Sequence, residues 1–185
     1  REAIKKIGLD DFDLPGLQNG SAISLQLNKI FSNHIEKLYL INFKYFSSSG
    51  KKEFYENFSF EINPSSYGEH LIKCWNFLRD QALFYPWHQT KKDNLILDKS
   101  FLEINYLHEK LIALLKAGET WDKMCKQLIK VDEIDLIKSC KSKLVFASNI
   151  SSPHYKFKEK FLELNNSSTW VDLSDEHTSW INQII

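Results

Sequence analysis

Two glycines four residues apart frame a glutamine near the start of the chain, in the run Gly16-Leu17-Gln18-Asn19-Gly20. The residues before this run, Phe12–Pro15, have the composition of a short strand, and an amphipathic helix follows it. In a G-x-S-x-G nucleophile elbow a strand turns sharply into a helix, and the central side chain is held above the sheet. A serine there can be deprotonated by a nearby histidine, whereas the carboxamide of Gln18 cannot become a nucleophile at ordinary pH. The sequence therefore predicts the geometry of a nucleophilic site without its reactive atom.

Other side chains could supply chemistry near this turn or elsewhere. Ser21 and Ser24 carry the nearest hydroxyl groups, but both fall on the helix after the turn, where capping and packing are their expected roles. Four histidines have no ligand partner at metal-binding spacing, and we expect them at the surface or at an interface, with no metal site: His34, His70, His108 and His154.

The elements around the turn predict a parallel sheet. A helix over residues 21–31 separates the first strand from the nearly continuous apolar run Lys37–Phe43, which has the length and composition of a strand buried on both faces. A second strand–helix–strand unit follows near the end, with strands at Lys143–Ser148 and Thr169–Leu173 and a helix over Tyr155–Leu164. A closing helix is expected through Trp180, Ile181 and Ile184. Short strand–helix–strand units imply parallel strands and an α/β fold.

A helical block separates the two units. Apolar residues at helical spacing predict helices over residues 68–84, 101–116, 121–129 and 133–138. We therefore divide the chain into core residues 1–46, a helical insertion 47–139 and core residues 140–185. An insertion between parallel strands is expected above their carboxyl ends, where such folds bind ligands.

The insertion contains an aromatic run, and its side chains are our candidates for substrate binding. Pro86 ends a helix, and the aromatic groups around it could form the roof of an apolar cavity or simply the core of the insertion: Trp75, Phe84, Tyr85 and Trp87. Arg79 and Asp80 are adjacent on a helix and point about 100° apart, so we expect each to pair elsewhere.

This order of elements resembles the C-terminal two-thirds of a lid-bearing α/β-hydrolase-fold protein, a group that includes esterases and epoxide hydrolases. The resemblance implies that Gln18 stands at the nucleophile position, that residues 47–139 form the helical cap, and that His177 stands where the family has its base. The family's acid would follow the strand at Lys143–Ser148, but residues 148–153 contain no carboxylate. With two of the three triad positions altered, the resemblance implies a degenerate and catalytically impaired site.

The resemblance also implies that N-terminal strands and half of the oxyanion hole precede the point that matches Arg1. We therefore expect a truncated or split form of a hydrolase of small apolar esters or similar substrates. The alternative is a non-catalytic binding module that holds a small apolar molecule. A complementary N-terminal half or a second copy of the chain is the expected protein partner.

The composition of the chain argues against several classes of function. Basic and acidic residues number 24 each, so no net charge favours nucleic acid or an anionic membrane surface. No apolar run reaches the roughly 20 residues needed to span a bilayer, and no residue pattern indicates a cofactor. Three widely spaced cysteines without an export signal fit reduced thiols and a cytoplasmic location.

Overall fold

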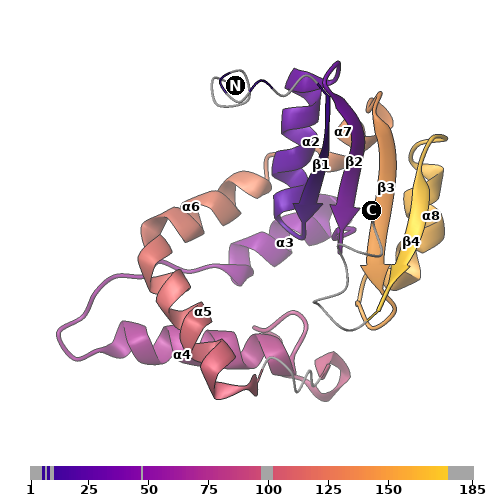
Figure 1. Cartoon of the computed structure of the whole chain (residues 1–185). Helices are drawn as coiled ribbons and strands as arrows, with labels where there is room; N and C mark the ends of the chain where they lie inside the picture. Colours follow the sequence, from indigo (N-terminus) through magenta and orange to yellow (C-terminus); the bar gives the residue numbers. More distant parts are fainter. Residues whose placement is uncertain (1–5, 7, 9–10, 47, 97–101, 175–185) are drawn as a thin grey trace. The chain divides into compact units, whose positions relative to one another are not determined.

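A computed structural model of the chain describes residues 6, 8, 11–46, 48–96 and 102–174 (Figure 1). The chain forms two compact units. One comprises residues 1–45 and 131–185, and the other comprises residues 46–130. None of the described helices is long and apolar enough to cross a membrane.

The first unit is built on a four-stranded parallel sheet with the order β1-β2-β3-β4 (Figure 1). The strands are β1 (Phe12–Leu17), β2 (Ile35–Ile41), β3 (Lys143–Asn149) and β4 (Thr169–Leu173). Gly16 pairs with Leu40, Leu40 with Phe146, and Phe146 with Trp170, so one row of residues crosses the whole sheet. The predicted parallel α/β sheet is confirmed. β1 is longer than the predicted strand, and β2 begins and ends two residues before its predicted limits.

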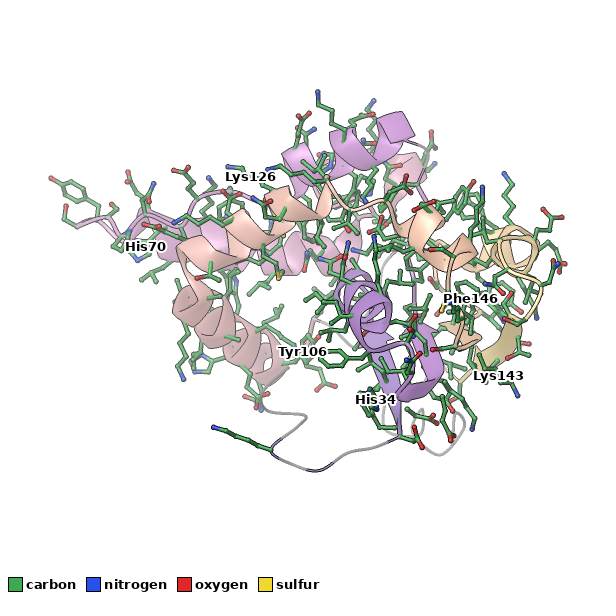
Figure 2. The ribbon with its side chains drawn as sticks, turned by 90° about the horizontal axis from the view of Figure 1, so that it is seen from above. His34, His70, Tyr106, Lys126, Lys143 and Phe146 are labelled. Atoms are coloured by element: carbon green, nitrogen blue, oxygen red, sulfur yellow. The ribbon has the colours of Figure 1, made fainter. Side chains whose placement is uncertain are left out.

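Helices cover one face of this sheet: α2 (Gly20–Phe31), α7 (Glu133–Lys138) and α8 (Lys158–Glu163). Phe146 of β3, labelled in Figure 2, is 1% exposed and stacks on Phe161 of α8 with ring centroids 5.2 Å apart. Burying one such side chain stabilises the fold by about 1.5–3 kcal/mol. Alternate residues of β2 and β3, together with the last residue of β4, form a second apolar cluster on the opposite face: Tyr39, Ile41, Val145, Ala147 and Leu173. Burial on both faces is the reason that the central parts of β2 and β3 are uninterrupted apolar runs.

The second unit is helical. It contains α3 (Ser48–Phe58), α4 (Glu69–Leu83), the short 3₁₀ helix η1 (Lys92–Asn94), α5 (Ile104–Ala117) and α6 (Glu119–Leu128). Its core is largely aromatic, because Phe77 of α4 lies within 5.0–5.1 Å, between ring centroids, of both Trp87 and Trp121. Ser59 donates a hydrogen bond to the buried Asp122 of α6.

Several elements differ from the sequence-based expectation. Helix α7 packs against α2 in the sheet unit, through the buried Leu136 and Ile137, so the helical unit ends at residue 130 rather than 139. Helix α3 was not predicted. The segment 155–164 divides into a 3₁₀ helix, η3 (Tyr155–Phe157), and α8. The closing helix predicted through Trp180 lies outside the described residues.

The expectation for Arg79 and Asp80 is wrong. The Nε and Nη2 atoms of Arg79 donate to Oδ1 of Asp80 at 2.9 and 2.7 Å. The guanidinium stem is long enough to reach back to its neighbour despite the diverging Cβ directions.

Candidate functional site

The junction between β1 and α2 holds Gln18 in a left-handed backbone conformation. Its φ is +50°, a value that an L-residue adopts at a cost of about 1–2 kcal/mol. The Gln18 N–H donates to the carbonyl of Ile41 at 2.8 Å, and the Gln18 carbonyl accepts the Ser21 N–H at 3.0 Å. The backbone is thereby fixed on both sides of the turn, while the Gln18 side chain is exposed at the carboxyl end of the sheet. Strain of this kind is held where surrounding structure determines the backbone, often at functional sites.

The two glycines of the frame have different roles. A Cβ at Gly16 would lie 2.7 Å from Cα of Ser21 and 2.7 Å from Oγ of Ser24, so α2 can approach β1 only because this residue is glycine. A Cβ at Gly20 would meet no atom within 4 Å. The close approach of strand and helix therefore requires glycine at position 16 and not at position 20.

The hydroxyls of Ser21 and Ser24 hold α2 against β1 through hydrogen bonds. Ser21 Oγ donates to the Gly16 carbonyl at 2.9 Å, and Ser24 Oγ donates to the Pro15 carbonyl at 3.1 Å. Both serines are buried, with 0% and 4% of their surface exposed. Their role is packing of the helix on the strand, as expected, although the N-cap position is Asn19 and makes no side-chain capping bond.

A network of hydrogen bonds between uncharged groups joins the carboxyl ends of β2, β3 and β4. Asn42 follows β2 with a φ of +48°, and its Nδ2 donates to Oδ1 of Asn149 at 2.9 Å. Asn42 Oδ1 accepts the Ser148 hydroxyl at 3.1 Å and the Asn149 N–H at 3.2 Å. Asn149 Nδ2 donates to the carbonyl of Ser174 at 2.8 Å. Sequence reasoning did not identify this network. Its one available signal was an asparagine directly after a strand, a residue that tolerates positive φ.

His154 lies in the loop after β3 and is 7% exposed, so the expectation of a surface histidine is wrong. Its Nδ1 accepts the N–H of Tyr45 at 3.2 Å, and its ring lies beside Phe157. Burial, assisted by the charges of Lys44 and Lys156, lowers the pKa of His154 to about 4, so the imidazole is neutral at pH 7. Lys44 also places Nζ 3.4 Å from Oδ1 of Asn19, in the turn between β1 and α2.

Comparison with solved structures identifies the architecture. A hydrolase from Pseudomonas aeruginosa PA01 matches with a TM-score of 0.60 and 13% identity, over 98% of this chain and 63% of that one. The enol-lactonase from Burkholderia xenovorans LB400 matches with a TM-score of 0.58 and 12% identity, over 98% and 64%. An acetylester hydrolase from Corynebacterium glutamicum gives 0.63 and 11%, over 97% and 58%.

The chain has the α/β-hydrolase fold. It spans about 63% of the length of the first structures that it matches. No protein-family model and no curated protein matches the sequence. At these identities the likeness establishes the fold and leaves the activity open.

In the α/β-hydrolase fold the acid and then the base follow the nucleophile along the chain. His177, the predicted base, lies outside the described residues. Asp172 of β4 precedes it, but its Oδ1 accepts hydrogen bonds from Trp170 Nε1 at 2.6 Å and Tyr155 OH at 2.8 Å. These two bonds, with a weaker one from Lys158, lower the pKa of the Asp172 carboxyl and hold it on the exposed side of β4. Asp172 therefore stabilises the edge of the sheet.

The aromatic residues predicted to bind substrate are distributed over the helical unit. Tyr85 packs 5.9 Å from Phe54, ring to ring, and burial raises the pKa of its phenol. Phe84 ends α4 and forms an isolated β-bridge with Leu95. Trp75 is half-buried on α4. Substrate binding by these side chains stays a prediction.

Trp87 lines a groove in the helical unit. Its Nε1 donates to the Phe58 carbonyl at 2.9 Å, which fixes the indole beside Phe77. The cavity is an open groove of about 460 Å³, largely apolar, lined by Glu69, Ile72, Lys73, Asn76, Phe77, Asp80 and Trp87.

Proposed function

We propose that this protein derives from serine-type hydrolases of small apolar esters or similar substrates, and that it does not hydrolyse esters through its elbow. The observation that carries the proposal is the backbone of Gln18. Its positive φ and its N–H bond to the Ile41 carbonyl support the proposal, because a nucleophile elbow holds its reactive residue in the same strained turn between a strand and a helix.

The chemistry of a carboxamide supports the loss of turnover. Its oxygen accepts and its nitrogen donates hydrogen bonds, but neither atom forms an acyl intermediate in water. Removing the nucleophilic serine of a complete triad lowers kcat by about 10⁶. The polar side chains of the network at the carboxyl ends of β2 and β3 are amides and a hydroxyl, those of Asn42, Ser148 and Asn149, so none of these described residues supplies a carboxylate to orient a base. Binding can outlast such losses because it does not require the reactive atom.

Hydrolysis of short p-nitrophenyl esters tests this proposal. We expect the purified chain to match the buffer rate, and we expect Gln18→Ala and His177→Ala to leave that rate unaltered. A rate well above background that disappears in His177→Ala would overturn the proposal, because it would require a working base and a nucleophile elsewhere in the chain.

A second candidate function, binding of a small apolar molecule, is supported by the groove in the helical unit. Phe77 and Trp87 are packed edge to face, with centroids 5.0 Å apart, and contribute aromatic surface to the groove. Ile72 is 63% exposed at its rim. A volume of about 460 Å³ falls in the range of small-molecule sites.

Fluorescence titration with the apolar dye anilinonaphthalene sulfonate tests the groove. We expect saturable binding that Ile72→Glu abolishes. Ile104→Glu is the matched control, since Ile104 is 75% exposed on α5 and does not line the groove. Equal effects of the two substitutions, or no saturable binding, would contradict this role.

A further inference from the structure

The turn between β1 and α2, which we call the elbow, contains the one Asn-Gly dipeptide of the sequence, Asn19-Gly20. We propose that Asn19 is a site of spontaneous deamidation, in which the backbone nitrogen of Gly20 displaces ammonia from the Asn19 side chain. This modification replaces a neutral amide by a carboxylate next to Gln18. It does not depend on whether the protein hydrolyses esters.

The reaction needs only water as co-reactant. The Gly20 amide nitrogen loses its proton to hydroxide and attacks Cγ of Asn19. The new N–Cγ bond closes a five-membered succinimide ring, and the Cγ–Nδ2 bond breaks as ammonia leaves with a proton from solvent. Water then adds to one of the two ring carbonyls and cleaves its bond to nitrogen. The products are a normal aspartyl linkage and an isoaspartyl linkage, each with one ammonia lost and one water gained.

Three features of the turn favour this reaction. Gly20 has no side chain to hinder the attack, and no atom lies within 4 Å of the position that its Cβ would occupy. Among the residues that the structure describes, none accepts a hydrogen bond from the Gly20 N–H. Lys44 Nζ lies 3.4 Å from Asn19 Oδ1, where the ammonium polarises the side-chain carbonyl and stabilises the negative charge that develops on its oxygen.

The backbone of the turn limits the rate. Asn19 has a φ of −63° and a ψ of −25°, helical values that keep the Gly20 nitrogen from attacking Cγ. The first turn must open, which breaks the bonds from Ser21 N–H to the Gln18 carbonyl and from Ala22 N–H to the Asn19 carbonyl, 3.0 and 3.3 Å long. Helix ends open at low free-energy cost, so we expect the native protein to react, and more slowly than the unfolded chain.

The folded turn stabilises the carboxylate that deamidation of Asn19 produces. A carboxylate at position 19 lies at the N-terminus of α2, where the helix dipole stabilises negative charge, and next to the ammonium of Lys44. The same charge repels an anion from the backbone N–H that follows the elbow residue, the position that contributes to the oxyanion hole in this fold.

Peptide mapping by mass spectrometry after incubation at mildly alkaline pH tests the proposal. We expect the peptide with Asn19 to gain the mass of deamidation, as aspartyl and isoaspartyl forms, faster than the peptides with Asn33, Asn57 or Asn166. Gly20→Ala fits without a clash and is expected to abolish the mass gain. Lys44→Met is expected to slow it several-fold, with circular dichroism confirming that both variants fold.

The unfolded chain in urea provides the reference rate. Conversion of Asn19 in urea with none in the native protein over the same period would overturn the proposal, since the helical turn would then block the reaction. A native rate at Asn19 no faster than at the other asparagines, or unchanged in Gly20→Ala, would also overturn it.

Discussion

Mild acid should destabilise the sheet unit through one buried histidine, His154. Its pKa in the folded protein is about 4, because burial disfavours the imidazolium, whereas an exposed histidine titrates near 6.5. Below pH 6.5 the unfolded chain binds a proton at His154, whereas in the folded chain His154 stays neutral until the pH approaches its lowered pKa. The stabilisation by neutral His154 is therefore complete above pH 6.5 and is lost as the pH falls from 6.5 to about 4.

The interval between 6.5 and about 4, at about 1.4 kcal/mol per pH unit, corresponds to about 3 kcal/mol of unfolding free energy. The imidazolium would also lose the Nδ1 lone pair that accepts the Tyr45 N–H. Urea unfolding at a series of pH values, followed by tryptophan fluorescence, measures the loss.

Other groups titrate in the same range, and burial also lowers the pKa of His88, so the comparison between variants decides the outcome. His154→Gln removes the titration and keeps a hydrogen-bond acceptor. Between pH 6.5 and about 4, we expect the unfolding free energy of this variant to fall by about 3 kcal/mol less than that of the wild type. His34→Gln, at an exposed position, should follow the wild type. Equal pH dependence in His154→Gln and the wild type would refute the reasoning.

Three further predictions concern the elbow and the network beside it. Gln18→Gly should raise the unfolding free energy by about 0.5–1 kcal/mol, because glycine adopts positive φ without strain. The same substitution at Gln26, an exposed residue within α2, should lower the unfolding free energy by about 1 kcal/mol. Urea unfolding of both variants checks that the two changes have opposite signs. Gly16→Ala should destabilise by about 1–3 kcal/mol through its clash with the α2 backbone, while Gly20→Ala should be neutral or slightly stabilising in thermal melts. Asn149→Ala should lower the unfolding free energy by about 1–3 kcal/mol in the same melts, since it removes the side-chain hydrogen bonds of a buried residue to Asn42 and to the Ser174 carbonyl.

The sheet was predictable because its strands carry a strong local signal. Each of β2 and β3 contains an uninterrupted apolar run of four residues, 38–41 and 144–147, and that pattern arises when helices or other segments cover both faces. The tight turn from β1 into α2 was predictable from Gly16 and its flanking elements, since a close strand–helix approach requires a residue without Cβ.

The parts that sequence reasoning missed depend on tertiary packing. Helix α7 is short, and its apolar pair Leu136 and Ile137 suits either unit; only the folded chain shows that it packs against α2. His154 stands in an irregular loop where no periodicity signals burial, and Phe157 and Tyr45 enclose it only after β2 and β3 pair. Helix α3 begins with serine, glycine and lysine, which are weak indicators of a buried helix.

The central claim is that the elbow keeps its geometry and lacks a nucleophile. Incubation with an alkyl fluorophosphonate, followed by intact-protein and peptide mass spectrometry, tests this claim most directly, because the reagent forms a stable adduct with an activated serine. We predict no adduct on the chain, since the hydroxyls nearest the elbow, Ser21 and Ser24, are buried and donate to strand carbonyls. A stoichiometric adduct on either serine would contradict the account and would identify a substitute nucleophile.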